Sequence, residues 1–346
     1  MTRIGMGKLP IHCSMNRQWL NWREHGMSSI QMQKASKPTR RSAAERMVEY
    51  GAIDNEFTVM EADIGKSTNS YLFGEVYPDR YFQMGIAELN MMSAAAGMAA
   101  GGRPVVVCGY GVFLSMRALE SVRSMICYPN LNVKLFASHG GITAAIDGVS
   151  HQSTEDISHL GTLPNMRILV PCDTISTQAC FDLAMENPGP FYMRYIRDAM
   201  YEVYGGEQDF RIGGSNIIKK GSDITIVSYG DLLFQAVEAS NELFKMGIDT
   251  EIIDAYSVKP IDWVSIKKSI QKTNRLIVLE NHQRRNGIGY ELAYRAMSEG
   301  MVCNFISMGL DDTFAETGDY PSLLNAYGLS AFHVVANAKK MMGKAR

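Results

Sequence analysis

The stretch IAELNMMSAAAGMAAGGRPVVVCGY, residues 86–110, decides the fold class of this 346-residue chain. Its first part, 86–100, consists of small and apolar residues that predict a buried helix, and the glycines after it end that helix. Its last part, 104–110, is a short β-branched run typical of a buried strand. Helical patterns and apolar runs alternate on both sides of it, in SAAERMVEYGAI (42–53), FTVMEAD (57–63), a helix through 114–125, NVKLFAS (132–138) and RILVPC (167–172). This alternation predicts an α/β fold with a doubly wound parallel sheet.

A second α/β rhythm follows DAMYEVYGGEQDFR (198–211), a charged, glycine-bearing stretch without periodicity. Its predicted strands and helices alternate, in DITIVSYG (223–230), a helix over 232–246, DTEIIDA (249–255), a helix over 261–272, RLIVLEN (275–281) and GYELAYRAMSEG (289–300). We therefore expect two doubly wound domains, 36–200 and the smaller 212–346, joined by a linker at 201–211. Residues 1–35 lack a sustained period, and we interpret them as a leader that is either poorly ordered or docks on a partner.

Composition limits the classes of function. The chain has 34 basic and 36 acidic side chains, so no global field would draw it to nucleic acid or to an anionic membrane. No apolar run reaches the length of a membrane span. Six cysteines are scattered without a metal-binding or C-x-x-C spacing, and the first residues lack a signal-peptide pattern, so we expect reduced thiols in a cytoplasmic protein.

Two segments carry candidate proton-transfer groups at the ends of predicted strands, where such sheets bind ligands. Glu88 lies in the first turn of an otherwise small and apolar helix, where a carboxylate either serves a site or only favours the helix dipole. The loop FASHGGITAAIDGVSHQSTED (136–156) holds His139, Asp147 and His151 directly after a strand. Two imidazoles and a carboxylate in one loop suit proton transfer and hydroxyl recognition, although surface histidines between turn glycines are an equally good interpretation.

A third segment, GPFYMRYIRDA (189–199), places Arg194 and Arg197 at the end of a short apolar run. Paired arginines there can bind a phosphate in a fork, but an ion pair between the domains is the commoner outcome.

Taken in this order, the segments resemble the transketolase family. The resemblance covers Lys37 to the end of the chain and is most specific in YPNLNVKLFASHGGIT (128–143), DGVSHQSTEDI (147–157) and LPNMRILVPCD (163–173). It implies a pyrimidine-binding domain followed by a transketolase C-terminal domain. The Gly-Asp-Gly motif with which the family's first domain binds diphosphate and magnesium is absent from the sequence. The chain therefore resembles the C-terminal subunit of a split transketolase, which should be inactive without a separate diphosphate-binding subunit.

The resemblance implies thiamine diphosphate as the cofactor, with the Mg²⁺ ligands on the partner subunit. Glu88 would hydrogen-bond the pyrimidine ring and favour the tautomer that removes the thiazolium proton. Phe113 would pack on the pyrimidine. Two following positions that are often aromatic in the family are Met116 and Leu119 here, so the apolar contact is kept but the aromatic stack is thinner.

The same resemblance assigns the substrate groups. His139 and His151 would hydrogen-bond the sugars and shuttle protons, and Asp147 would recognise a hydroxyl beside the reacting carbonyl. The family usually has an acidic residue where Ile146 stands. The positions that match the family's sugar-phosphate site are Arg40, Ser67, His139 and Arg197, with Arg41 as an alternative to Arg40. Such a site would suit a sulfonate almost as well as a phosphate.

Asp63 resembles a dimer-interface acid of the family. The second domain carries no expected catalysis, so Glu280, His282 and Arg284 are interpreted as interface or helix-capping residues. The expected assembly is a heterotetramer of two large and two small subunits, with the small subunits in contact through both domains.

Other classes of protein remain open on the sequence. The beta subunit of a 2-oxo acid dehydrogenase has the same two domains and also lacks the diphosphate motif, and 1-deoxyxylulose-5-phosphate synthase is a weaker rival because it is normally one long chain. A degenerate regulatory subunit without activity is the alternative from a different class.

Overall fold

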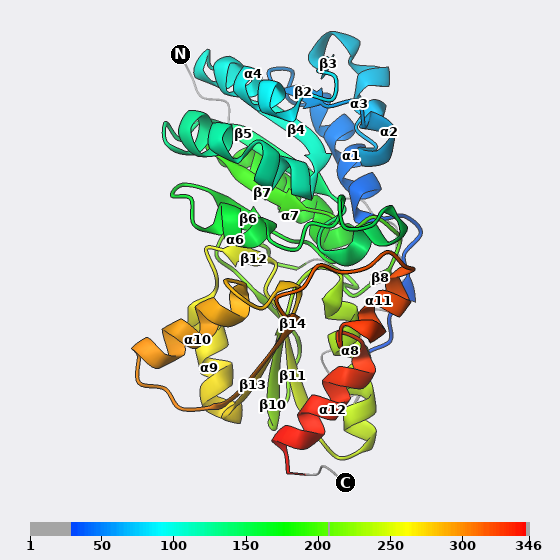
Figure 1. The fold of residues 1–346 in the computed structure, drawn as a ribbon, viewed down its shortest axis with the longest axis vertical. Helices are drawn as coiled ribbons and strands as arrows, with labels where there is room; N and C mark the ends of the chain where they lie inside the picture. Colours follow the sequence, from blue (N-terminus) through cyan, green and yellow to red (C-terminus); the bar gives the residue numbers. More distant parts are fainter. Residues whose placement is uncertain (1–28, 207, 344–346) are drawn as a thin grey trace.

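We describe the protein from a computed structural model that places residues 29–206 and 208–343 (Figure 1). The first domain contains a seven-stranded sheet. The strand order is β12-β6-β7-β5-β4-β2-β3, and β2 to β7 run parallel while β12 is antiparallel to β6. The strands are β2 (Thr58–Glu61), β3 (Tyr81–Gln83), β4 (Val105–Tyr110), β5 (Val133–Ser138), β6 (Arg167–Leu169), β7 (Phe191–Arg194) and β12 (Ser257–Lys259). This parallel sheet confirms the predicted α/β class.

Helices cover both faces of this sheet because its central strands are apolar on both sides. In β4, Val106 packs on the face covered by α1 (Thr39–Gly51) and α7 (Thr174–Glu186), whereas Val105 and Val107 pack on the opposite face. The opposite face is covered by α4 (Glu88–Ala100), η3 (Phe113–Arg117), α5 (Leu119–Ser121), η4 (Val122–Cys127) and α6 (Asp156–Gly161). The remaining short helices of this domain are α2 (Gly65–Thr68), α3 (Tyr71–Val76), η2 (Pro78–Arg80) and η5 (Ile142–Asp147).

The segment 114–125, predicted to be a single helix, is not a regular α-helix in the structure. The segment consists of two π-helical turns, η3 and η4, on either side of the single turn α5. The wider turns are a local departure from the regular i→i−4 pattern, and such turns are frequent at functional sites. Phe113 and Met116, two residues predicted to contact the cofactor, both lie in η3.

The second domain contains a five-stranded sheet of order β14-β13-β10-β11-β9, in which β9 is antiparallel to β11 and the other strands are parallel. Helices α8 and α12 cover one face, and α9 and α10 lie on the other (Figure 1). The elements are β9 (Asn216–Lys219), β10 (Ile224–Ser228), α8 (Leu232–Lys245), β11 (Thr250–Asp254), α9 (Trp263–Thr273), β13 (Arg275–Gln283), α10 (Ile288–Ser298), β14 (Asn304–Leu310), α11 (Tyr320–Ala326) and α12 (Ala331–Met341). The second doubly wound domain is therefore also confirmed.

The junction between the domains is more interwoven than the sequence suggests. Strand β12 belongs to the second domain in sequence but extends the sheet of the first. Part of the expected leader is folded: β1 (Gln33–Lys34) pairs with β8 (Tyr201–Glu202), which lies within the expected linker. Ile30 is buried and exchanges two hydrogen bonds with the side chain of Asn241 on α8. Residues 1–28, the rest of the predicted leader, lie outside the described residues.

The described cysteines Cys108, Cys127, Cys172, Cys180 and Cys303 are free thiols, and the first four are buried. No helix in the described ranges is long and apolar enough to cross a membrane.

Candidate functional site

The candidate site lies at the carboxyl ends of the parallel strands β2, β4, β5 and β7. Phe113 follows β4, His139 follows β5 and Arg197 follows β7, while Ser67 lies in α2 after β2. Parallel strands bring these ends to one edge of the sheet, where α/β proteins bind ligands. Residues far apart in the sequence therefore meet there.

Glu88 is the buried carboxylate of the site. It lies at the start of α4, where the helix dipole favours a negative charge, and its side chain is 3% exposed. Its Oε2 accepts a hydrogen bond of 2.9 Å from Nη1 of Arg117, and among the described residues none donates to Oε1. The guanidinium of Arg117 also lies 4.5 Å from the centre of the Phe113 ring. Arg117 thus connects the two residues predicted to hold the pyrimidine.

Apolar side chains remain exposed around Glu88. Ile86 and Leu89 flank it in sequence, and Met116 and Met125 lie on η3 and η4, which contact α4. Met116 is 46% exposed, whereas Leu119 is half-buried and packs against the core of the domain. An apolar patch beside a buried carboxylate is typical of a surface that a ligand or another chain covers.

An aromatic cluster brings the two histidines together. The ring of Tyr110 lies 4.4 Å from that of His139 and 5.3 Å from that of His151, both in edge-on contact. Phe113 lies 5.8 Å from Tyr110 and 5.6 Å from His151. The cluster joins the Glu88 end of the site to the loop that carries His139, Asp147 and His151.

His139 is held as a neutral imidazole. It is 2% exposed and has a positive φ of 64°, and its Nδ1 lies 2.8 Å from Oγ of Ser138. Burial first, and then the charges of Arg40 and Arg197, lower the pKa of His139 to about 3. The ring is therefore uncharged at neutral pH and can exchange hydrogen bonds with a hydroxyl.

Asp147 lies between His139 and Arg197. Its Oδ2 is 3.7 Å from Nε2 of His139 and 3.6 Å from Nε of Arg197, both longer than a direct hydrogen bond. The carboxylate is about one-third exposed. It can therefore accept a hydrogen bond from a ligand that lies beside the imidazole of His139 and the guanidinium of Arg197.

The predicted anion site is partly assembled. Nη1 of Arg40 donates to the carbonyl of Ser67, and Nε of Arg40 is buried without a partner among the described residues. Burial first, and then the nearby Arg197, lower the pKa of Arg40. Two arginines whose charges repel each other form a place where an anion would be stabilised.

The neighbouring arginines have partners of their own. Nε of Arg41 donates to Glu45 on its own helix at 2.6 Å, which favours Arg40 over Arg41 for the anion site. Arg194 is buried with Nε 3.5 Å from Oδ2 of Asp156, and its Nη2 donates to the carbonyl of Asn281 at 2.6 Å. Arg194 therefore pairs within the first domain and bonds the second, and of the two arginines only Arg197 lies beside Asp147.

The other predicted positions lie outside the site. Asp63 accepts from Gln83 at 2.7 Å on the exposed surface. Glu280 accepts from the backbone N–H groups of Ile288 and Gly289 and so caps α10, and His282 lies 3.2 Å from Ser158 of the first domain.

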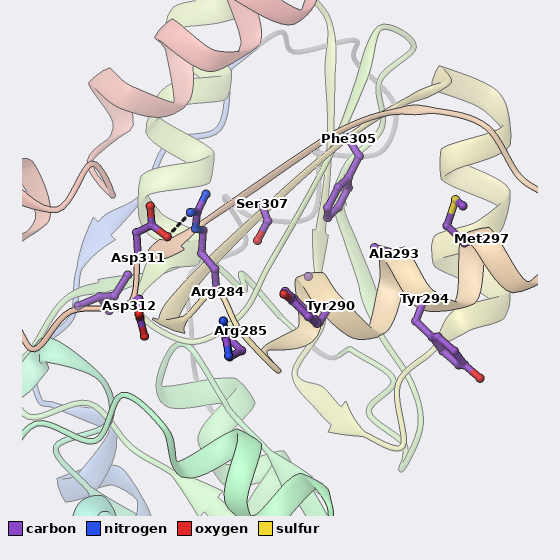
Figure 2. A pocket seen from close by; sticks show the side chains of 12 residues that line it. Arg284, Arg285, Tyr290, Ala293, Tyr294, Met297, Phe305, Ser307, Asp311 and Asp312 are labelled. Carbon is purple, nitrogen blue, oxygen red and sulfur yellow. Dashed lines mark hydrogen bonds and ion pairs between the residues drawn. The ribbon is translucent and has the colours of Figure 1, made fainter.

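A groove lies on the second domain, and the predicted position Arg284 lines it. The groove has a volume of about 610 Å³ between α10 and the edge strand β14. Figure 2 shows Tyr290 and Met297 along α10, Phe305 on β14, and Arg284 paired with Asp311 at one end. Its exposed aromatic and apolar side chains indicate a surface for contact with protein.

Two family models match the chain. The transketolase pyrimidine-binding domain matches residues 35–202, and the transketolase C-terminal domain matches residues 213–334. The chain belongs to the transketolase family. Because both models match in the order of the two observed domains, the family resemblance drawn from the sequence is confirmed.

Transketolase relatives of similar length support this membership. The chain is 31% identical to one of the subunits of the apulose-4-phosphate transketolase of Phocaeicola vulgatus, over 88% of this chain and 97% of that one. It is 30% identical to the 6-deoxy-6-sulfo-D-fructose transketolase subunit SqwH of a Clostridium species, over 87% and 94%. A solved structure described as a split gene transketolase, inactive beta4 tetramer, has 36% identity and a TM-score of 0.82 over 89% of this chain and 99% of that chain. The chain is thus homologous to C-terminal subunits of split transketolases.

Sequence reasoning missed two residues of the site. Tyr110 ends β4 and contacts both histidines, and its place after a β-branched run, next to Phe113, was the available signal. Arg117 contacts Glu88 across 29 positions, and no local pattern indicates that pairing.

Proposed function

We propose that this chain is the C-terminal subunit of a thiamine-diphosphate-dependent transketolase that transfers a two-carbon ketol unit between sugars. The observation that carries the proposal is the buried Glu88 carboxylate, which is joined through Arg117, Phe113 and Tyr110 to the two histidines of one loop. A buried acid, an aromatic ring and hydroxyl-binding groups are the parts that the family's reaction requires.

The residues present fit the pyrimidine end of thiamine diphosphate. The buried Glu88 has a carboxylate oxygen available to a ring nitrogen, and Phe113 and Met116 offer half-exposed apolar surface beside it. When bound, the cofactor supplies the electron sink that stabilises the transferred two-carbon unit. Glu88 would hold a proton at the ring nitrogen, and Phe113 would orient the ring and keep water from it.

The diphosphate and Mg²⁺ are assigned to a partner subunit. In the part of the chain that the structure describes, no three His, Cys, Asp or Glu side chains are grouped as metal ligands. The solved split-gene relative is described as an inactive tetramer of its beta chain, which supports a requirement for the second subunit. We propose a heterotetramer in the cytoplasm, with two copies of this chain in contact through both domains and the groove at α10 as part of the contact in the second.

The substrate groups act on a sugar with an anionic end. Neutral His139, with His151, would exchange hydrogen bonds with the hydroxyls, and Asp147 would accept from the hydroxyl beside the carbonyl. Arg40 and Arg197 would hold the anion. The two named relatives act on a phosphorylated and a sulfonated sugar, and both anions suit this pair of arginines.

A ketol-transfer assay tests the function and the anion site together. The chain is mixed with an N-terminal diphosphate-binding subunit, thiamine diphosphate and Mg²⁺. Ketol transfer from xylulose 5-phosphate tests the function, and a ketose donor without a phosphate, supplied with an aldose with or without its phosphate, tests the anion site. We expect Arg40→Met to lower kcat/KM for the phosphorylated aldose by about 10–100-fold, because a charge-assisted hydrogen bond is lost. The rate with the unphosphorylated aldose should change little.

Arg41→Met is the matched control, since Arg41 is adjacent but pairs with Glu45. No ketol transfer by the wild-type mixture, with phosphorylated or sulfonated sugars, would reject the proposed function. An equal loss for both aldoses in Arg40→Met would reject the anion site.

A further inference from the structure

The substrate loop rests on the second domain. The backbone N–H of Ile142, in the middle of the predicted substrate loop, donates at 2.9 Å to Oδ1 of Asn281 on β13. The other end of the same amide donates at 2.7 Å to Oδ2 of Asp231, which precedes α8. Asn281 is 1% exposed, so its two hydrogen bonds are made away from water. One amide thus ties the loop to the framework of the second domain.

The two glycines that follow His139 allow this approach. A Cβ atom on Gly140 would overlap the side chain of Arg194, and one on Gly141 would overlap that of Asn281. Gly141 also has a φ of 59°, which other residues rarely adopt. The glycines of His139-Gly140-Gly141 are therefore explained by close packing of the loop backbone on Arg194 and Asn281.

Further contacts follow the loop toward its end. Nε2 of Gln152 donates to the carbonyl of Glu316 at 3.1 Å, and the backbone N–H of Gln283 donates to the carbonyl of Thr154 at 2.8 Å. Helix α11 packs against η5, which holds Asp147. The second domain therefore supports the loop at its middle and at its end, while His139 and Asp147 face the first domain's site.

We propose that Asn281 is a positioning residue, through which the C-terminal domain holds residues 139–147 in the shape that presents His139 and Asp147 to the sugar. The proposal rests on the proposed function for the role of the loop, but its structural part stands on the contacts alone. Without the amide, the buried N–H of Ile142 loses its acceptor, so the loop should leave this conformation more often. The cofactor groups Glu88 and Phe113 lie on other elements and should be unaffected.

Hydrogen exchange of the full chain tests the structural part without any need for activity. In Asn281→Ala, we expect the peptide covering 139–147 to exchange at least about tenfold faster than in the wild type. Thr250→Val is the matched control, because Thr250 is an equally buried polar residue of the second domain whose hydroxyl bonds Ser240 and not the loop. The exchanged pair Asn281→Asp with Asp231→Asn keeps an oxygen that can accept from Ile142 and an amide that can donate between the two positions, so it should bring exchange back toward the wild-type rate.

Kinetics of the complex with the diphosphate-binding subunit test the catalytic part. We expect Asn281→Ala to raise KM for the aldose about tenfold or more, with an unchanged half-saturation concentration of thiamine diphosphate.

Unchanged hydrogen exchange at 139–147 in a folded Asn281→Ala, or an equal increase in exchange in Thr250→Val, would overturn the proposal. If Asn281→Ala does not fold, exchange of 139–147 in the double variant Asn281→Asp with Asp231→Asn that is faster than in Thr250→Val would overturn it too. Faster exchange at the loop in Asn281→Ala, combined with a wild-type complex that lacks ketol transfer, would instead reject the proposed function alone.

Discussion

Glu88→Gln is expected to lower kcat for ketol transfer by about 10²–10⁴-fold, the range that a positioned proton donor or acceptor contributes. Glutamine has the same shape and can still accept from Arg117, so the fold and the contact with η3 should be retained. It cannot share a proton with a pyrimidine nitrogen as a carboxyl group does. The measurement is the initial rate of ketol transfer in the complex at saturating cofactor, alongside the circular dichroism of the variant.

Glu120→Gln is the control for this substitution, because Glu120 is an exposed acid on α5 close to the same turns. Its rate should match that of the wild type. A Glu88→Gln complex that retains more than about a tenth of the wild-type rate would contradict the role given to Glu88.

Asp156→Ala is expected to give the largest loss of stability, about 3–5 kcal/mol in the free energy of unfolding. Asp156 and Arg194 are both buried, and Oδ2 of Asp156 lies 3.5 Å from Nε of Arg194 and accepts from the hydroxyl of Tyr192 at 2.5 Å. Removal of the carboxylate leaves a buried guanidinium without its counter-charge at the contact between the domains. Urea unfolding followed by fluorescence measures the loss.

Asp182→Ala measures the loss of stability for an ion pair that is partly exposed to solvent. Asp182 binds Arg46 through two hydrogen bonds of 2.8 and 3.0 Å, but both side chains are about one-quarter exposed. Solvent screens this pair, so its loss should be about 1 kcal/mol or less. Equal losses of unfolding free energy in Asp156→Ala and Asp182→Ala would show that the buried Asp156–Arg194 pair stabilises the protein no more than the partly exposed pair does.

The fold could be predicted from the sequence because its signals are local. The apolar run of β4 and the small, apolar helix before it are visible in a single stretch, 86–110, and α4 begins at Glu88, close to the predicted start at Ile86. The parallel order of both sheets then follows from the alternation of strands and helices. The π-helical turns of η3 and η4 could not be predicted, since their composition also suits an α-helix.

The domain junction depends on contacts between distant residues and was only partly foreseen. The pairing of β12 with β6 joins Ser257 to Leu169, and no pattern in either segment indicates the other. The folded end of the leader likewise depends on its pairing with β8. Boundaries drawn from composition therefore divided elements that the structure connects.

In the candidate site, too, the features that depend on local sequence could be predicted and those that depend on distant contacts could not. The chemistry of Glu88, His139 and Asp147 could be proposed from their residue types and their places after strands. The partners of Arg194 could not be predicted, because Asp156 and Asn281 lie 38 positions before and 87 positions after it.

We propose that this chain supplies only the pyrimidine half of a site shared with a second subunit, and the affinity of the complex for thiamine diphosphate is the most direct test. Calorimetric titration of the cofactor with Mg²⁺ should be carried out on the chain alone, on the diphosphate-binding subunit alone, and on their mixture. We expect tight binding only in the mixture, weakened by Glu88→Gln. Equally tight binding by the isolated chain, or no gain on mixing, would contradict it.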